Sequence, residues 1–342
     1  MKIIVDCMGG DNAPLEVVRG AVAAKKEYGT ELLLVGYERD IRAILEEEKA
    51  DLSGIGIADA LETVTMEDDP IAVIKKKPDS SMVIALHLLA DGKGDAMVST
   101  GNTGALFTGA TLIARRLRGV KRPAIASVLP MQKPVLLLDS GANVVATREY
   151  LCQFAVMGSI YMQKNFGIER PRVGLLNNGA EACKGTPLQQ ETYMALQALP
   201  NLNFVGNVEG DRVPFDVCDV LVADGFTGNI LLKTMEGMGH LMKGALKEAL
   251  LSDPFVALPA ALIQGKLKKE LAKYDSSEYG GAPILGAARP VIKAHGSSDA
   301  KAVKNAIRQA AAYASSGTAE TIEEELAVFA HPVQTEETEE LK

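Results

Sequence analysis

The sequence predicts an α/β protein with a mostly parallel sheet covered by helices on both faces, in three α/β/α layers. Short apolar runs alternate with segments of helical period along most of the chain. The runs, such as 31–36 (ELLLVG), are almost continuously apolar, as is typical of strands buried on both faces. The 342 residues, of which 47% are hydrophobic, can form one large core or two domain-sized units.

The alternation can be followed from the N-terminus. Apolar runs predict strands at residues 2–6, 31–36, 95–100, 172–177, 203–208 and 217–223. Segments of helical period predict helices at 14–28, 38–49, 80–91, 102–117, 147–165, 186–198 and about 228–251. A last α/β unit is expected at 290–316, followed by a short helix near 318–328.

Residues 124–139 interrupt this alternation. Two strand-like runs are joined there by a short polar turn with Pro130 and Pro134, which predicts a hairpin. The sequence has no repeat of fixed period and no linker rich in Gly, Ser or Pro. We therefore expect residues 1–330 to form a single catalytic module, with two lobes as an alternative, and 331–342 to form an acidic tail.

The charge distribution bears on partners and location. Residues 320–342 hold eight Glu and one Lys, a net charge of −7 out of −8 for the whole chain, so the body is nearly neutral. Aromatic residues are only 5% with no Trp, which argues against a nucleic-acid surface. Since the sequence shows neither a signal peptide nor a membrane span, we expect a cytoplasmic protein, at most attached to a membrane surface.

Neither cysteine nor histidine spacing predicts a metal site. The four cysteines are scattered, which favours reduced thiols: Cys7, Cys152, Cys183 and Cys218. The four histidines are scattered too, and His295 alone lies in a polar loop between a predicted strand and a helix. We expect no metal and no cofactor.

Small polar residues and glycines cluster after one predicted strand after another. The clusters lie at 6–14, 99–104, 139–143, 177–179 and 224–229. Because the carboxyl ends of parallel strands share one edge, we expect these five loops to converge there. Glycines and helix N-termini at such an edge suit phosphate or an oxyanion, and 99–104 is the strongest candidate. For a single loop, an ordinary N-capping turn remains the alternative.

Standard fingerprints are absent or weak. No G-x-G-x-x-G follows the first strand, and the sequence has no G-x-S-x-G. Residues 179–186 resemble a P-loop only loosely, with the lysine and the second glycine exchanged. Lys184 lies just before a probable helix start at Thr186-Pro187, where a bound anion would offset the unfavourable placement of a cation. An exposed loop lysine is the alternative.

Several loops together resemble the PlsX family of phosphate acyltransferases. The residues that carry the resemblance are Val5-Asp6-Cys7-Met8-Gly9-Gly10-Asp11-Asn12-Ala13-Pro14, Ser99-Thr100-Gly101-Asn102-Thr103-Gly104-Ala105, Leu138-Asp139-Ser140-Gly141-Ala142-Asn143, Asp224-Gly225-Phe226-Thr227-Gly228-Asn229, Glu278-Tyr279-Gly280-Gly281-Ala282-Pro283 and Ala294-His295-Gly296-Ser297. The similarity covers residues 1–328, and only the tail beyond 330 departs from it.

This resemblance implies a reaction and an architecture. A fatty acyl group would move from acyl carrier protein to inorganic phosphate, and a membrane acyltransferase would use the acyl phosphate to acylate glycerol 3-phosphate in phospholipid synthesis. The implied fold is isopropylmalate-dehydrogenase-like, with a helical dimer-interface segment. A homodimer, no required metal and no nucleotide are also implied.

The residue roles are hypotheses that combine the loop chemistry with this reaction. Phosphate is itself the nucleophile, so the protein needs to position it and to stabilise the oxyanion. The proposed catalytic residues are Lys184, His295, which would donate a proton to the departing sulfur, and Asn229. The proposed phosphate-binding residues are Gly101, Asn102, Thr103, Gly104, Asn12 and Asn143.

Two further surfaces are predicted. An acidic carrier protein would dock on basic residues, either Lys266, Lys268, Lys269 and Lys273, or a second cluster of Arg115, Arg116, Arg118, Lys121 and Arg122. The apolar stretch that precedes the first cluster would touch anionic membrane through a tip that includes Leu258 and Leu262. Packing in a helical dimer core is the alternative for the tip.

Two other enzyme functions and one binding function remain open from the sequence. A small-molecule phosphate acetyltransferase would differ in the chain length of its substrate. A decarboxylating dehydrogenase of the same architecture would need a nicotinamide cofactor and a divalent metal held by Asp6, Asp11, Asp139 and Asp224. A non-catalytic anion sensor would bind phosphate without consuming a thioester.

Overall fold

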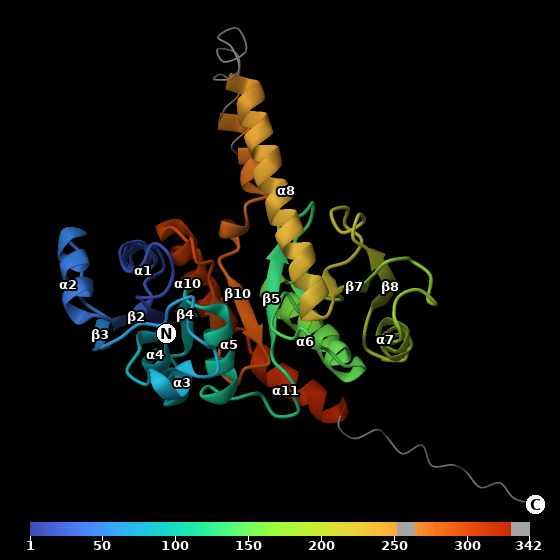
Figure 1. Ribbon diagram of the computed structural model, residues 1–342, viewed down its shortest axis with the longest axis horizontal. Coiled ribbons are helices and arrows are strands. Elements are labelled where there is room, and N and C mark those ends of the chain that lie inside the picture. Colours follow the sequence, from blue (N-terminus) through green and yellow to red (C-terminus); the bar gives the residue numbers. More distant parts are fainter. Residues whose placement is uncertain (252–262, 264, 268, 330–342) are drawn as a thin grey trace, which may run out of the picture.

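The computed structural model describes residues 1–329 except 252–262, 264 and 268 (Figure 1). The strands are β1 (Lys2–Asp6), β2 (Glu31–Gly36), β3 (Ile55–Asp59), β4 (Ala96–Ser99), β5 (Ala124–Leu129), β6 (Val135–Leu138), β7 (Val173–Asn177), β8 (Phe204–Glu209), β9 (Val220–Val222), β10 (Ala282–Leu285) and β11 (Val291–Lys293). The helices are α1 (Leu15–Tyr28), α2 (Glu38–Glu47), α3 (Val73–Lys76), α4 (Ser81–Ala90), α5 (Thr103–Leu112), α6 (Arg148–Phe166), α7 (Pro187–Gln197), α8 (Gly225–Leu251), α10 (Ala300–Ser315) and α11 (Thr318–Phe329).

All of these strands belong to one sheet, in the order β3-β2-β1-β4-β11-β10-β5-β6-β9-β7-β8. The pairs within β3-β2-β1-β4-β11 are parallel, and so are those within β6-β9-β7-β8. Between these halves β10 pairs antiparallel with β11 and β5, and β5 pairs antiparallel with β6. Three successive reversals leave the two halves running in opposite directions.

This reversal corrects one expectation. The carboxyl ends of β1, β4 and β11 point to one edge of the sheet, and those of β6, β7 and β9 point to the other. The five polar loops therefore do not share an edge, and the predicted convergence is wrong. The predicted hairpin at 124–139 is confirmed as β5 and β6, and it is one cause of the reversal.

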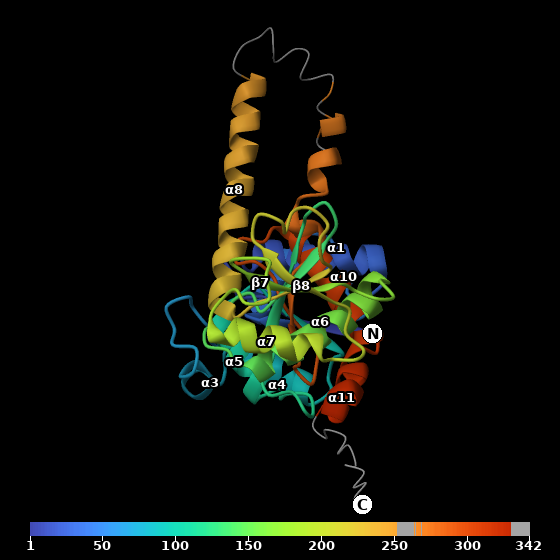
Figure 2. The same cartoon turned by 90° about the vertical axis from the view of Figure 1, so that its right-hand side faces the viewer.

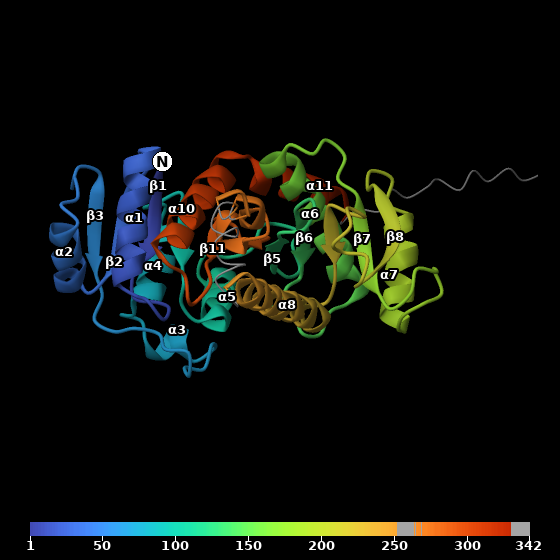
Figure 3. The same cartoon turned by 90° about the horizontal axis from the view of Figure 1, so that it is seen from above.

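Helices cover both faces of the sheet, which confirms the three predicted layers. Leucine and isoleucine side chains of α4 and α5 pack with Ile125 of β5. Apolar side chains of α8 pack with Leu129 of the same strand. Residues 125 and 129 point to the same face because side chains alternate along a strand. Helices α1, α6 and α10 bury their apolar sides in the large core on the opposite face. Figure 3 shows α1, α10 and α11 along one side and α3, α5 and α8 along the other.

Helix α8 crosses the sheet and projects beyond it. Its start is pressed against the loop after β6, since a Cβ on Gly228 would lie 2.0 Å from the carbonyl oxygen of Asp139. Leu231, Leu232 and Met235 then pack on the second half of the sheet. Beyond them the helix rises free of the body (Figures 1 and 2) and exposes Leu241 and Met242, each 63% accessible.

Most predicted elements are confirmed to within a few residues. The sequence analysis missed β3, β10 and α3. Strand β3 is only half-buried at the sheet margin, and β10 (APIL) contains Pro283, so neither shows a continuous apolar run. The helix predicted for 102–117 ends at Leu112, and the chain then turns through Arg115, which has φ +66°. The tail 331–342 lies outside the described residues.

None of the described helices is both long enough and apolar enough to span a membrane.

We predict that Gly228→Ala destabilises the protein whereas Gly237→Ala, in the same helix, does not. The added methyl at position 228 collides with the Asp139 carbonyl and should cost about 1–3 kcal/mol, as overpacking does. At position 237 nothing lies within 4 Å, and alanine should favour the helix by about 1 kcal/mol. Thermal unfolding of both variants tests this. Equal melting temperatures of the two variants would contradict the close contact between the start of α8 and the Asp139 carbonyl.

Candidate functional site

Three polar loops meet at the carboxyl ends of β1, β4 and β11. A Cβ on Gly9 would lie 2.6 Å from the Gly101 Cα, so the first two loops touch through backbone alone. The Asp11 N–H donates to the Gly296 carbonyl at 2.8 Å, and the Asn12 Nδ2 donates to the Ser297 carbonyl at 3.1 Å. Asn12 therefore ties the first loop to the loop after β11, and its side chain is engaged in that role.

Asp6, at the end of β1, connects the segments of this group of loops through hydrogen bonds. Its buried carboxylate accepts hydrogen bonds from Ser81 Oγ at 2.6 Å, Ser99 Oγ at 2.7 Å and the Met8 N–H at 3.3 Å. Burial raises the pKa of Asp6, and these hydrogen bonds act in the opposite direction. All the partners are protein groups, so Asp6 organises the loops.

The start of α5 offers free donors at the same edge. Asn102 caps the helix, since its Oδ1 accepts the Ala105 N–H at 3.0 Å, while its Nδ2 donates to the Thr65 carbonyl at 3.1 Å. The side chain of Asn102 is thus engaged on both sides. The N–H groups of Thr103 and Gly104, the next two residues, have no acceptor among the described residues. Free N–H groups at a helix start favour an anion.

Lys293, which the sequence analysis did not single out, ends β11 beside Ser99. It is buried, with 9% of its surface accessible, and its Nζ donates to the Thr100 carbonyl at 3.4 Å and to the Ala294 carbonyl. Burial, with a smaller effect of Lys233, lowers the pKa of Lys293 to about 8. From the sequence alone, a lysine at the end of an apolar strand is expected to be exposed to solvent. Its strand register, which the sequence does not reveal, is what places it inside.

His295 follows two residues later and stands at the surface of this edge. Its Nδ1 lies 2.9 Å from Ser297 Oγ and accepts the Ser297 N–H at 3.3 Å, which leaves the proton of the neutral ring on Nε2. Burial, followed by the positive charge of Lys233, lowers the pKa of His295. The imidazole is therefore neutral near pH 7 and can donate from Nε2.

A second group of loops lies at the other edge, after β6 and β9. The buried carboxylate of Asp139 accepts the Asn143 N–H at 2.6 Å, the Asn143 Nδ2 at 2.9 Å and the Ile125 N–H at 3.1 Å. Asn143 also donates to the Pro123 carbonyl at 2.9 Å, so its side chain is fully engaged. Asn229 in the first turns of α8 is exposed and lies over Gly141.

Helix α8 connects the two groups. It begins at the second group, and about two turns later Lys233 influences the titration of both Lys293 and His295 in the first, while Glu236 influences that of His295. Between the apolar clusters under α5 and α8, Ser127 of β5 is only half-buried, and its Oγ lies 2.7 Å from Ser140 Oγ. A polar strip thus runs across the sheet between α5 and α8.

The structure does not bring Lys184 to the 99–104 loop. Lys184 is exposed in the loop after β7, where its backbone carbonyl accepts from Asn177 Nδ2 at 3.2 Å and its side chain lies against Gly179. Strands β4 and β7 are six inter-strand steps apart in the sheet, roughly 29 Å at about 4.8 Å per step. Its catalytic role stays a prediction.

The predicted docking residues are described only in part. Leu258, Leu262 and Lys268 lie outside the described residues. Lys266, Lys269 and Lys273 are exposed, and Lys273 pairs with Glu270 at 2.6 Å. The second basic cluster follows α5, and all five of its members are exposed: Arg115, Arg116, Arg118, Lys121 and Arg122.

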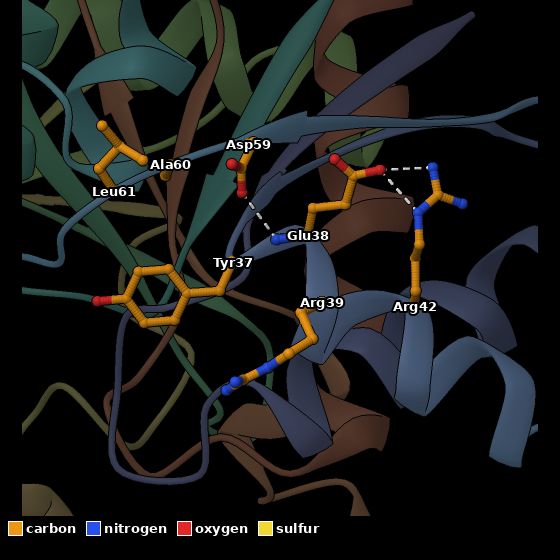
Figure 4. Close-up of a pocket in the computed structure, with 7 residues that line it drawn as sticks. All are labelled: Tyr37, Glu38, Arg39, Arg42, Asp59, Ala60 and Leu61. Atoms are coloured by element: carbon orange, nitrogen blue, oxygen red, sulfur yellow. Dashed lines mark hydrogen bonds and ion pairs between the residues drawn. The ribbon is translucent and has the colours of Figure 1, made fainter.

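A shallow pocket of about 520 Å³ opens elsewhere, beyond the carboxyl ends of β2 and β3 (Figure 4). Its charged groups bind one another: the Glu38 N–H donates to Asp59 at 2.9 Å, and the Glu38 carboxylate pairs with Arg42 at 2.6 Å. None of the residues predicted for the site lines it.

The described residues include no cluster of three or more His, Cys, Asp or Glu side chains placed to hold a metal ion. Of the four aspartates that a metal-dependent dehydrogenase would use, Asp6 and Asp139 are engaged as above, and Asp224 accepts from Thr227 N–H and Oγ1.

Comparison with known proteins gives consistent results. A family profile described as "Fatty acid synthesis protein" matches residues 1–321. A relative from Thermoanaerobacter pseudethanolicus named phosphate acyltransferase is 44% identical over 328 residues, which cover 95% of this chain and 97% of the relative.

Two solved structures bear on the fold. A phosphotransacetylase from Streptococcus pyogenes superposes with a TM-score of 0.63 at 18% identity, over 92% of this chain and 94% of its own. A putative 4-hydroxythreonine-4-phosphate dehydrogenase from Salmonella typhimurium gives 0.51 at 13% identity, over 91% and 98%. At such identities they show the fold alone, and they confirm the dehydrogenase-like architecture that was expected.

We predict that the imidazole of His295 titrates below the ordinary pKa of 6.5. Burial and Lys233 both disfavour its charged form, so the ring should stay neutral until the pH falls below that value. NMR titration, with the signal assigned through His295→Gln, measures this. A midpoint at or above 6.5 would mean that partial desolvation and the charge of Lys233 do not act on the ring as the structure indicates.

Proposed function

The chain belongs to the fatty acid synthesis protein family, and we propose that it is a phosphate acyltransferase that forms acyl phosphate from a fatty acyl thioester and inorganic phosphate. The resemblance to the PlsX family is confirmed by the family profile over residues 1–321 and by the relative that shares 44% identity. The thioester that we propose is acyl-acyl carrier protein. The dehydrogenase and acetyltransferase alternatives are not favoured.

The reaction needs few groups from the protein. An oxygen of the phosphate dianion attacks the thioester carbonyl carbon, and a C–O bond forms as the C–S bond breaks. The hydroxyl proton of the phosphate is lost and a proton is gained by the departing thiolate, so the products are acyl phosphate and a free thiol. Since phosphate is the nucleophile, the site must hold the phosphate, stabilise the oxyanion and manage one proton.

The observation that carries the proposal is the pair of free N–H groups at the start of α5, at the edge of the sheet where the loop of His295 also lies. Thr103 and Gly104 can donate to a phosphate or oxyanion, and the Nε2 proton of His295 can go to the departing sulfur. Four further residues would support the site by fixing the shape of its loops. One makes a close backbone contact and the others bind protein groups through their side chains: Gly101, and Asn102, Asn12 and Asn143. Asn229 remains a candidate for the oxyanion.

The proposed partners are supported unequally. The exposed apolar side chains along the projecting part of α8, which include Met238, Leu241 and Met242, support a homodimer. The cluster at 115–122 adjoins Pro123, whose carbonyl binds Asn143, so an acidic carrier protein docked there would border the second group of loops. Contact with anionic membrane and transfer of the product to a membrane glycerol 3-phosphate acyltransferase remain proposals, as does the cytoplasmic location.

We predict that the protein consumes acyl-acyl carrier protein only when phosphate is present. Purified protein should release free carrier thiol with phosphate and none above background with chloride at equal ionic strength, and hydroxylamine should trap the acyl phosphate as hydroxamate. Consumption that continues without phosphate would indicate a thioesterase. Reduction of a nicotinamide cofactor would indicate the dehydrogenase.

We also predict that no cysteine carries the acyl group. Cys7, Cys152 and Cys218 are buried, and burial raises the pKa of each thiol, to about 11 for Cys152 and about 12 for Cys218. Because the thiolate is the nucleophilic form, these thiols are inert, and only Cys183 is exposed. Single alanine variants should each keep activity. A labelled acyl group trapped on any of the four in the absence of phosphate would refute direct transfer.

A further inference from the structure

Lys293 puts a positive charge inside the protein, and no carboxylate of the described residues pairs with it directly. Asp6 and Asp11 act on it only as more distant charges. Its Nζ is surrounded by backbone, donating to the carbonyls of Thr100 and Ala294, and it makes no ion pair among the described residues. An ammonium group with 9% exposure is costly to bury unless it is paired. An anionic ligand would supply that missing partner.

The same edge of the sheet presents the free donors of α5. Lys293 lies beside Ser99 in the strand register, and the chain passes from Ser99 through Thr100, which Lys293 contacts, to the unpaired N–H groups of Thr103 and Gly104. The buried ammonium and the helix start therefore reach the edge within a few residues of each other. Both favour an anion with several acceptor oxygens.

Helix α8 adds a second cation from the other side. Lys233 acts on both Lys293 and His295, and its own partner is Glu236, 2.7 Å away on the same helix. Two ammonium groups that face each other repel, and an anion between them converts the repulsion into attraction. Lys233 is 54% exposed, so it can turn toward a ligand that arrives.

We propose that Lys293 is the buried cation that binds the phosphate in front of α5, and that Lys233 closes the same site from α8. The proposal rests on the proposed function and deepens it. It assigns to Lys293 the role of phosphate-binding cation that the sequence analysis gave to Lys184. Lys293 contacts a phosphate oxygen directly, opposite the N–H groups of Thr103 and Gly104. His295 follows Lys293 by two residues and is influenced by its charge, so a proton donor is available at the same edge of the sheet.

The test compares Lys293→Met with Lys301→Met. Lys301 is an exposed lysine of α10 that already has a carboxylate partner, Glu278, so it is the control for removing a lysine charge that needs no ligand. Phosphate should raise the melting temperature of the unsubstituted protein and of Lys301→Met relative to chloride at equal ionic strength, because a ligand of the native state stabilises it. It should not do so for Lys293→Met, whose KM for phosphate should be about 10²-fold higher.

Lys233→Ala keeps the proposal testable if Lys293→Met does not fold. As an exposed helix position it should fold normally, and its KM for phosphate should rise by about 10-fold, with a smaller phosphate-dependent rise in melting temperature. The proposal is overturned if both variants keep a normal KM for phosphate and a normal phosphate-dependent rise in melting temperature. If Lys293→Met is insoluble, the same result in Lys233→Ala alone overturns it.

The pH dependence gives an independent readout. The groups that face Lys293 and His295 are Asp6, Asp11, Lys233 and Glu236. With its pKa lowered to about 8, Lys293 loses its charge as the pH rises through that value, so phosphate binding should weaken there. In Lys293→Arg the charge persists and the loss should move to higher pH. An unchanged midpoint in Lys293→Arg overturns the assignment.

These outcomes separate the two levels of inference. If the protein forms no acyl phosphate yet phosphate raises its melting temperature through Lys293, the proposed reaction fails and the binding site stands. If acyl phosphate forms normally in Lys293→Met with an unaltered KM, the reaction stands and the assignment of Lys293 fails.

Discussion

A buried carboxylate must have its charge met by hydrogen-bond donors, and the architecture of both loop groups depends on that constraint. Asp6 gathers the N–H of nearby Met8 and the hydroxyls of Ser81 and Ser99, which come from two segments that are remote in sequence. Asp139 gathers backbone N–H groups and one amide at the other edge of the sheet. Hydrogen bonds to a charged group are each worth about 1.5–3 kcal/mol, so each carboxylate fixes its loop firmly. The loops then need little packing of their own and can leave N–H groups free.

The antiparallel strands β10, β5 and β6 impose a second constraint on the site, the separation of its two groups of loops. They turn the two parallel halves in opposite directions and so separate the loops by the width of the sheet. Helix α8 overcomes the separation, because it begins against Asp139 and has climbed about 12 Å by Lys233, at about 1.5 Å per residue. One helix therefore fixes the geometry of one loop group and delivers charge to the other.

Much of this could be predicted from the sequence, and the failures share one cause. Periodicity identified β1, α1, the hairpin and α6 because each carries a local apolar pattern. The polar loops were identified because small residues cluster after strands. The direction of each half, the placement of Lys184 far from α5 and the burial of Lys293 depend on which strands pair, and strand pairing is not a local property. Asn102 and Asn143 cap or brace loops, and amides that bind ligands are the same residue type, so the sequence does not distinguish the two roles and their contact with phosphate stays a prediction.

A site of this kind suits a reaction in which the nucleophile is an anion from solution. An enzyme that activates its own serine or cysteine needs a base within hydrogen-bond reach of it, whereas one that uses phosphate needs positive potential and fixed donors. Backbone N–H groups supply the donors without requiring any reorganisation. A buried lysine whose pKa is lowered to about 8 is still mostly charged near pH 7, and a dianion beside Lys293 raises that pKa and extends the charged state to higher pH. The ligand then offsets the cost of a buried charge that no carboxylate of the described residues pairs with directly.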